Sequence, residues 1–451
     1  MSKIEVNAIE PQCGTNLTVG ASGDTITFPS GTTVVNNGSQ TGFGRTGTVD
    51  WDTTAKTASF TAVSGNGYFV NTTSGAVTLT LPASPSAGDI VAIADYARTF
   101  ATNNVTVGRN GSNIQGEAVD GTIRTNGQST TFVYVDGTKG WVPTEDQTTG
   151  NYGASYVIAT GGTITCCGDF KIHTFTGPGT FTVTCAGNAG GSNTVDYLVI
   201  AGGGGGGGAQ TYNAAGAGGA GGYRESSGAA SGCYTRGPLN GCVPALPVSA
   251  TSYPITVGGG GGGGGVATDG TNGSNSIFST ITSTGGGGGA GYTPTPRQGN
   301  SGGSGGGSAG GSPAGGLGNT PPSSPPQGND GGNTAATPGN AATGGGGGAG
   351  SVGGPSHSTN QGGNGGAGIT SCITASPVAR GGGGAGGNDY AEATNNATAS
   401  AGGGGIGNGA PASSGTANTG GGGGASGVNN TTVYGAGSGG SGVVIIRYKY
   451  R

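Results

Sequence analysis

The sequence predicts an all-β protein with essentially no α-helix, in which β-rich N-terminal and middle regions precede a C-terminal polyglycine-II helix sandwich on a small β base. Three observations lead to this class. No segment shows the 3.6-residue apolar period of an amphipathic helix. Short Thr/Val/Ile-rich runs recur between turn residues in the first half. In the second half, glycine tracts follow strand-like runs, as in VDYLVIAGGGGGGGAQ, residues 195–210.

The glycine content has to be weighed first against disorder. The chain has 113 glycines and 21 prolines among 451 residues, a share at which a non-periodic chain is usually disordered. Only 8% of the residues are charged and the formal net charge is −4, so the high charge that keeps disordered segments solvated is missing. The same weak charge provides no basic patch for phosphates, so we expect no nucleic-acid partner.

The cysteines and the first residues indicate where the chain is made. Seven cysteines are an odd number spread thinly over a long chain, so we expect at least one free thiol. For Cys233 and Cys242, in CYTRGPLNGC, a disulfide and mere proximity both fit the spacing. The opening MSKIEVNAIEPQCG lacks the apolar core of a secretory signal, so we expect no export.

Composition divides the chain into four parts. A lead of short Thr/Val/Ile runs precedes a region with better strands, such as GYFVNTT, AVTLTLP and GDIVAIADY, at the spacing of a small sandwich or barrel with one core. A predicted hairpin base and a glycine-rich region follow. The predicted boundaries are 1–44, 45–150, 151–201 and 202–451.

Two pairings are expected inside these parts. Trp51 and Trp141, near the two ends of the middle region, are expected to pack together in its core rather than to form a ligand platform. FKIHTFTGPGTFTVTC, residues 170–185, is predicted to form a β-hairpin around its Gly-Pro-Gly turn.

The glycine tracts predict ordered helices rather than a loose tail. Four strand-like segments adjoin them, namely VDYLVIA, TSYPITV, SIFSTITST and VVIIRYKY, and a flexible linker would need none of these. A polyproline-II-like glycine helix has three residues per turn and no internal hydrogen bonds, so its backbone must bond to neighbours. We therefore expect pure glycine runs to lie inside, and side chains at every third position, such as Ala217 and Ala220, to lie on the outer layer.

Catalytic and metal-binding constellations are weak, so we expect no enzyme, no cofactor and no metal. His173 and His357 are the only histidines, and we expect a structural or exposed role for each. Asp50 and Asp52 are expected in a solvated turn. Gly-x-Gly-x-x-Gly matches arise by chance in this composition, and no phosphate-loop lysine follows them. Cys166, Cys167, His173 and Cys185 lack a recognisable zinc spacing.

Several phrases carry a family resemblance. MSKIEVNAIEP, GYFVNTTSGAVTLTLPASPSAGDIVAIADY and GGSGVVIIRYKY resemble tail-fibre proteins of tailed bacteriophages. HTFTGPGTFTV followed by VDYLVIAGGGGGGG is similar to their glycine-rich domains and to the polyglycine-II sandwich of tail-tip adhesins. The resemblance implies a virion protein made in the host cytoplasm, which binds a host outer-membrane protein or surface glycan. It further implies a homotrimer through about residue 150 that docks on a tail or baseplate protein through residues 1–44.

The receptor-binding residues are predicted from the direction of the helices. If the strand-like segments form one base, the glycine helices run away from it and return, and the loops at the far end face the host. Tyrosine suits such loops because it offers a large face with a polar end at little entropic cost. The candidates are Tyr212, Tyr292, Arg297, His357, Asp389, Tyr390 and Tyr434.

Two alternatives stay open. The tyrosine rings could merely cap the ends of the glycine helices. The chain could also be a secreted glycine-rich structural or ice-binding protein, because flat arrays with rows of Thr or Ala could present a surface to ice. The expected lack of an export signal argues against this second function.

Overall fold

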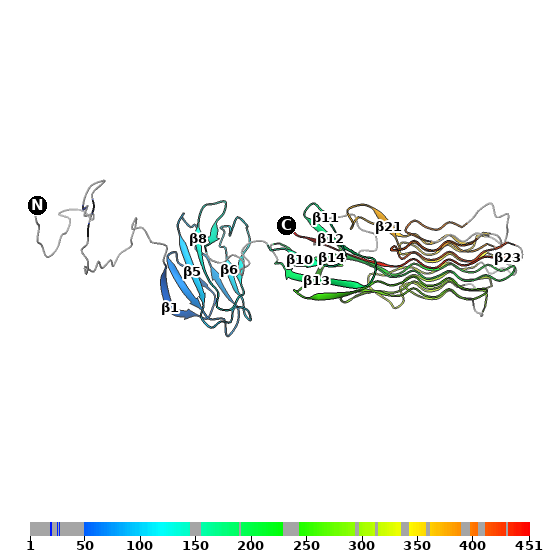
Figure 1. Ribbon diagram of the computed structural model, residues 1–451, viewed down its shortest axis with the longest axis horizontal. Coiled ribbons are helices and arrows are strands. Elements are labelled where there is room, and N and C mark those ends of the chain that lie inside the picture. Colours follow the sequence, from blue (N-terminus) through cyan, green and yellow to red (C-terminus); the bar gives the residue numbers. More distant parts are fainter. Residues whose placement is uncertain are drawn as a thin grey trace, which may run out of the picture. The chain divides into compact units, whose positions relative to one another are not determined.

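The structure is a computed structural model (Figure 1). It describes residues 19, 25, 27, 49–144, 155–188, 191–228, 243–293, 297–311, 314–334, 342–357, 361–388, 397–404, 411–429 and 432–451. Every regular element in this part of the chain is a β-strand, which confirms the all-β class. Contact clustering separates residues 1–48 from 49–451. The predicted pair Cys233 and Cys242 lies outside the described residues.

The middle domain consists of two sheets between which the chain alternates. Its strands are β1 (Asp50–Lys56), β2 (Phe60–Thr61), β3 (Asn66–Val70), β4 (Val77–Thr80), β5 (Ile90–Asp95), β6 (Val105–Gly108), β7 (Gly121–Ile123), β8 (Ser129–Tyr134) and β9 (Trp141–Pro143). One sheet has the order β1-β3-β5-β8-β9 and the other β2-β4-β6-β7. The pairs among the first six strands are parallel, because each connection passes through a strand of the opposite sheet.

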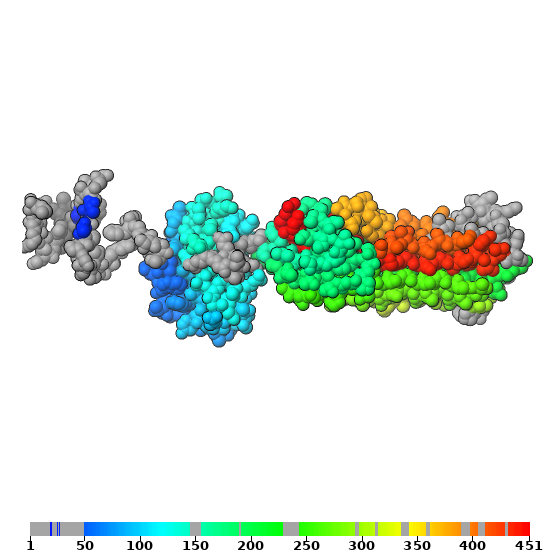
Figure 2. Space-filling view, in the orientation of Figure 1, coloured from blue at the N-terminus to red at the C-terminus, as the bar shows by residue number. Residues whose placement is uncertain are grey.

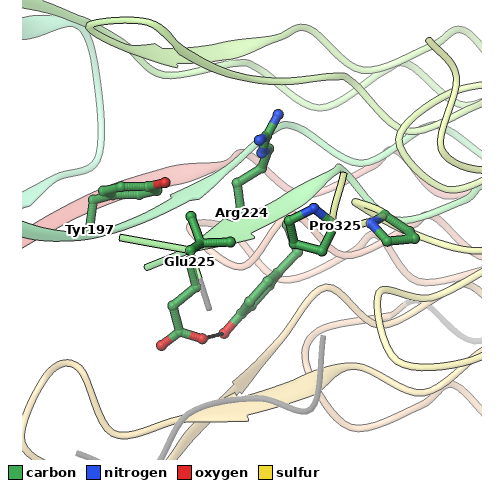
Figure 3. A pocket seen from close by; sticks show the side chains of 7 residues that line it. Tyr197, Arg224, Glu225 and Pro325 are labelled. Atoms are coloured by element: carbon green, nitrogen blue, oxygen red, sulfur yellow. Dashed lines mark hydrogen bonds between the residues drawn. The ribbon is translucent and has the colours of Figure 1, made fainter. Parts of the chain in front are cut away.

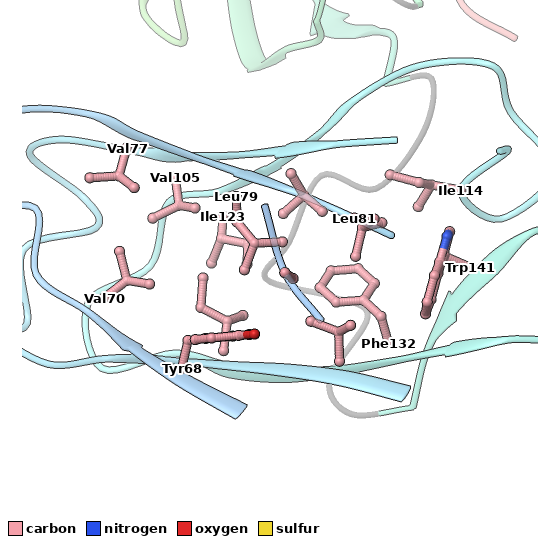
Figure 4. Packing of buried hydrophobic residues seen from close by; sticks show 14 of the residues in the cluster. Tyr68, Val70, Val77, Leu79, Leu81, Val105, Ile114, Ile123, Phe132 and Trp141 are labelled. Atoms are coloured by element: carbon pink, nitrogen blue, oxygen red, sulfur yellow. The ribbon is translucent and has the colours of Figure 1, made fainter. Parts of the chain in front are cut away.

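The core of this domain lies between the two sheets (Figure 4). Val, Leu and Ile side chains of alternate positions, such as Leu79, Val105 and Ile123, meet the rings of Phe132 and Trp141 there, all fully buried. The prediction of one core between strands of alternating pattern is confirmed.

The predicted contact between Trp51 and Trp141 is wrong. Trp141 is 0% exposed, whereas Trp51 is 43% exposed and stacks on Phe69. The reason is the strand order: β1 and β9 form the opposite edges of the same five-stranded sheet, so the two residues are kept apart by the width of that sheet.

Two further sheets form the base of the glycine-rich region. The bounds of their strands are β10 (Val157–Thr160), β11 (Thr163–Cys167), β12 (Phe170–Phe175), β13 (Gly179–Ala186), β14 (Thr194–Ile200), β15 (Tyr223–Glu225), β16 (Leu246–Pro247), β17 (Ser252–Thr256), β18 (Ser276–Phe278), β19 (Ile281–Ser283) and β24 (Val443–Lys449). One sheet has the order β10-β13-β17-β18-β19. The other has the order β11-β12-β24-β14-β15, with β16 also on β14. The four strand-like segments beside the glycine tracts are thus confirmed as β14, β17, β18 with β19, and β24.

The predicted hairpin of residues 170–185 is wrong. β12 pairs with β11 and β24, whereas β13 pairs with β10 and β17, so the two strands belong to different sheets. The glycine turn carries the chain from one layer to the other. Phe175 and Phe181, on either side of this turn, enter the same buried cluster between the layers. Burial of both rings therefore replaces the direct pairing that the turn residues suggest.

Two small hairpins lie within the glycine-rich region, β20 (Ile369–Ser371) with β21 (Val378–Arg380), and β22 (Val428–Asn429) with β23 (Thr432–Val433). Between them and the base run long extended segments without strand assignment, which we call the glycine array. The array leaves the sheets at β14 and returns to them at β24, and β23 lies at its opposite end (Figure 1).

Hydrogen bonds in the array have a period of three residues. The N–H groups of 202–208 donate in turn to three antiparallel segments, 268–274, 437–440 and 216–219. Its carbonyls accept in turn from three parallel segments, 261–264, 286–289 and 423–426. All these N···O distances lie between 2.8 and 3.1 Å, so a backbone without internal bonds is satisfied entirely by its six neighbours. The polyglycine-II helix, which also requires defined backbone angles, stays a prediction.

Close approach explains why 202–208 is pure glycine. Every residue of this segment is buried. A Cβ at any of the seven positions would lie less than 3.0 Å from a neighbouring backbone carbonyl, a distance that side chains do not tolerate. The strand before the tract is therefore followed not by a linker but by the most enclosed segment of the array.

Two expectations about the inside and outside of the array are wrong. The tract 258–265 is pure glycine yet lies at the surface, where Gly259, Gly262 and Gly265 are exposed and have room for a Cβ. On the face seen in Figure 2 this segment and 268–275 form the green strip beside the red strip of 434–442, and Gly439 donates to Gly261. Conversely, Ala217 and Ala220 are fully buried, because the array has room for a methyl group at selected interior positions.

Glycine-poor segments also belong to the array. Segment 268–274, predicted to be a loop, runs back toward the sheets and accepts hydrogen bonds from 202–208. Its only glycines, Gly270 and Gly273, are the positions where a Cβ would collide with 202–206. Segments 297–303 and 314–319 behave in the same way. An outer segment thus needs glycine only where it faces a neighbour.

Candidate functional site at the distal end of the glycine array

The end of the array away from the sheets, which we call the distal end, consists of the turns between outgoing and returning segments. The turns at 209–215, 266–268, 291–297 and 428–434 belong to it. Glycine tracts position each turn because the segments before and after it are held by the hydrogen-bond network of the array. The hairpin β22–β23 marks this end in Figure 1.

Tyr212 occupies the turn that joins two buried segments. The turn is closed by two backbone hydrogen bonds between Gln210 and Asn213, at 3.0 and 2.7 Å. Tyr212 has a φ of 60°, a left-handed conformation that is uncommon for a residue with a side chain. Its side chain is 60% exposed. The turn therefore presents the ring outward on a fixed backbone.

Tyr292 and Arg297 come together as the sequence grouping predicts, but mainly with each other. The guanidinium carbon of Arg297 lies 3.8 Å from the centre of the Tyr292 ring, a cation–π contact. Arg297 Nη1 also donates to the carbonyl of Gly310 at 2.6 Å, and its backbone φ is 59°. This pair joins two turns of the distal end and leaves both side chains partly exposed.

Hydrogen bonds connect neighbouring distal turns. The N–H of Ala267 donates to Ala209, and the N–H of Thr293 donates to Ala267, each at 2.9 Å. Val266, beside Ala267, is 70% exposed. Sequence reasoning missed Val266, although an apolar residue directly after a long glycine tract was a signal that could have marked it.

Tyr434 lies close to the turn of Tyr212 through an apolar cluster. Ala209, Ala215 and Val428 are buried together, with Val433 packed against them. The N–H of Tyr434 donates to the carbonyl of Gly427 at 3.2 Å, and its side chain is partly exposed. The structure therefore brings the turns of Tyr212 and Tyr434 to one apolar seam.

His357 is exposed at the end of a different outgoing segment. Its N–H donates to the carbonyl of Gln361 at 3.2 Å, and the preceding residue, Ser356, bonds to Asn333. The remaining two candidates, Asp389 and Tyr390, lie outside the described residues.

Ionisable groups away from the distal end have structural surroundings. His173 is fully buried between the base sheets, with Nδ1 at 2.7 Å from the carbonyl of Gly161 and Nε2 at 3.0 Å from the Tyr448 hydroxyl. Burial lowers the pKa of His173 below its usual 6.5. Since a carbonyl only accepts, Nδ1 carries the proton and Nε2 accepts from Tyr448. Burial likewise raises the pKa of the Tyr448 hydroxyl.

The predicted solvated turn at Asp50 and Asp52 is wrong, because both residues belong to strand β1. Lys56 Nζ lies 2.8 Å from Asp52 Oδ2, and the hydrogen bond from Lys56 lowers the pKa of this carboxyl. The two carboxylates therefore sit on an exposed strand edge beside a lysine rather than flanking a cleft.

A small cavity lies beside β15, lined by Tyr197, Arg224, Glu225 and Pro325 among others (Figure 3). Its volume of about 10 Å³ is no more than the room one water molecule needs. Glu225 is 3% exposed and accepts hydrogen bonds from Tyr223 at 2.8 Å and from Ser371. These contacts join β15 to the hairpin β20–β21, so the carboxylate links two elements of the fold.

Two searches of the described residues found nothing. They contain no group of three or more His, Cys, Asp or Glu side chains arranged to hold a metal ion. They also contain no helix with the length and hydropathy to span a bilayer.

Comparison with known families identifies the glycine-rich part. Residues 174–449 match the family described as glycine-rich domain, a span that takes in β13 to β24 and the whole array. The chain belongs to this family. A comparison with curated proteins found no match.

Proposed function

We propose that the protein is a tail fibre of a tailed bacteriophage, which adheres to the host cell surface through the distal turns of its glycine array. The observation that carries the proposal is the gathering of exposed side chains, Tyr212, Val266 and the Tyr292–Arg297 pair, on turns at one end of a scaffold whose interior is backbone. Such turns tolerate sequence change while the scaffold keeps its shape.

The chemistry of these turns suits a surface receptor. Tyrosine rings with fixed backbones offer large contact areas at low entropic cost, and the arginine adds directed donors. The resemblance of the opening and middle phrases to tail fibres supports the same function from a separate part of the sequence. By the same resemblance, the working form is a homotrimer attached to the virion through its first residues.

The first experiment measures binding to bacterial surfaces. Fluorescently labelled full-length chain is mixed with outer-membrane vesicles from a panel of Gram-negative bacteria, and bound protein is counted after sedimentation. We expect binding to vesicles of some strains and its loss when Tyr212, Tyr292 and Tyr434 are all changed to Ala. Because these side chains are exposed or partly exposed, the melting temperature should change little.

A matched control uses another exposed side chain of the array. Leu317 is 57% exposed on a segment whose carbonyl accepts from Gly302, near the sheets rather than the distal end. Leu317→Ala should bind as the unchanged chain does. Equal binding by the triple variant would refute the distal site, and a lack of binding to every vesicle would count against an adhesin.

The assembly is tested separately by light scattering and imaging. The full chain should have a mass of three times 42.1 kDa in solution. Antibodies against it should label the tails of tailed particles in negative stain. A monomer or label confined to the capsid would contradict the tail-fibre proposal.

A further inference from the structure

Trp51 has no part in the core of the middle domain or in the glycine array. Its indole is 43% exposed on the edge strand β1. The register places Trp51 beside Gly67 of β3, and a Cβ at Gly67 would lie 2.8 Å from two indole carbons. The ring thus lies directly over the glycine, and Phe69 supports it at a centroid distance of 4.8 Å. Glycine at 67 is what allows the indole to lie close against the sheet.

Trp51 is the first of three aromatic residues that step across the outer face of this sheet. Phe69 on β3 lies two residues beyond the partner of Trp51, and Tyr96 lies two residues beyond Ala94, the partner of Phe69. The N–H of Tyr96 donates to Val70 at 3.0 Å, so the pairing continues one residue past β5. Tyr96 is 60% exposed. With normal strand geometry the consecutive Cα atoms are roughly 8 Å apart.

The surroundings of these rings are small and uncharged. Ala92 and Ala94 on β5 and Ser129 and Thr131 on β8 share the outer face in register. The outward positions of β3, β5 and β8 carry no Asp, Glu, Lys or Arg. The nearby Lys56 lies on the other side of the sheet, with its Nζ 5.8 Å from the ring centre of Tyr68.

We propose that Trp51, Phe69 and Tyr96 form a binding site for a linear chain of neutral pyranose sugars. A pyranose ring has an apolar C–H face that stacks on an aromatic ring, and hydroxyls around its rim that bond to serine and threonine. A diagonal of three rings contacts linked sugars rather than a single one. The absence of charge on the described outer face favours a neutral glycan over an anionic one. This site is separate from the proposed distal site.

The test uses the intrinsic fluorescence of the full chain. Only two tryptophans are present, and Trp141 is fully buried, so a change of emission on adding a glycan reports on Trp51. The probes are soluble hydroxyethyl cellulose, xylan and dextran, with the anionic polygalacturonate for comparison. We expect at least one neutral polysaccharide to quench or shift the emission, and polygalacturonate to have no effect.

Variants assign the response to the three rings. Retardation in gels that contain the active polysaccharide measures affinity without the fluorophore. Trp51→Ala should abolish retardation, and Phe69→Ala and Tyr96→Ala should each weaken it about tenfold. Tyr212→Ala, at the distal end, should bind the polysaccharide as the unchanged chain does, which separates this site from the proposed adhesive function.

Several results would overturn the proposal. No response to any of the three neutral polysaccharides would do so, as would equal binding of polygalacturonate. Unchanged retardation of Trp51→Ala or Tyr96→Ala would remove the assigned rings. Tyr96 is mostly exposed, so its variant should fold normally and keeps the test valid if a change at Trp51 impairs folding.

Discussion

The middle domain and the glycine array fill their interiors in opposite ways. In the middle domain, side chains such as Phe132, Leu79 and Trp141 fill the space between two sheets. In the array, residues 202–208 bring backbone against backbone, and side chains are excluded. A side-chain core can adjust its rotamers to a change, whereas a backbone core has nothing to move except the segments themselves. The two regions should therefore differ sharply in their tolerance of substitution.

The largest expected effect tests the backbone core with the smallest side chain. Gly205→Ala places a methyl group against the carbonyl of Gly262, and the array can relieve the clash only by separating segments. We expect loss of the cooperative melting transition, or a destabilisation above about 4 kcal/mol. Circular dichroism during heating and limited proteolysis measure the result.

Gly262→Ala is the matched control, in the same array and with the same chemical change. A Cβ at Gly262 comes no nearer than 3.7 Å to the Thr271 hydroxyl. Its effect should stay within about 0.5 kcal/mol. Equal tolerance of both variants would show that the array is not held by close backbone contact.

A smaller effect is expected from a comparable change in the side-chain core. Phe132 is fully buried in the same cluster as Trp141, so Trp141 fluorescence follows unfolding of this domain in urea. Phe132→Ala should cost about 3–5 kcal/mol through the lost contacts and the cavity. Leu79→Met, which keeps volume, should cost less than about 1.5 kcal/mol. If Leu79→Met proved as damaging as Phe132→Ala, the contrast in tolerance would fail.

The smallest expected effect concerns the base, where side chains and the array meet. The pKa of His173 is lowered by burial and by the charge of Lys171, so the unfolded chain binds a proton more readily than the folded one. Stability from this residue is therefore present above the unfolded pKa of about 6.5 and is lost as the pH falls below it. We expect the melting temperature to fall between pH 7.5 and pH 5.

His173→Phe removes the titrating group and serves as the control. Its melting temperature should fall less steeply over the same pH range, although it starts lower because Gly161 and Tyr448 lose a partner. Identical pH slopes would exclude His173 as a source of acid sensitivity.

The sequence predicted elements better than neighbours. Strands such as β4 and β5 could be found because alternating apolar residues between turn residues are a local signal. Strand order is not local, so the separation of Trp51 from Trp141 could not be foreseen. The same limit explains the wrong hairpin, since nothing between β12 and β13 tells that the turn changes layers.

In the glycine-rich region the visible signal was too narrow. Pure tracts attracted attention, but a segment needs glycine only where a neighbour approaches, as Gly270 and Gly273 show. Of the candidate site, the aromatic residues at the distal end could be predicted from the alternation of outgoing and returning segments. The pairing of Tyr292 with Arg297 and the exposure of Trp51 over Gly67 depend on side-chain geometry that no pattern encodes.

The position of β24 bears on how the protein is made. This strand lies between β12 and β14 in the centre of its sheet, although it follows both by almost the whole array. A ribosome must therefore synthesise every intervening segment before the central strand is available, and the contacts of 202–208 with 423–426 and 437–440 wait equally long. Such long-range closure is slow. A chain released early would lack the strand that closes the base, and the cell would hold an open sheet and unpaired glycine backbone instead of a shortened fibre.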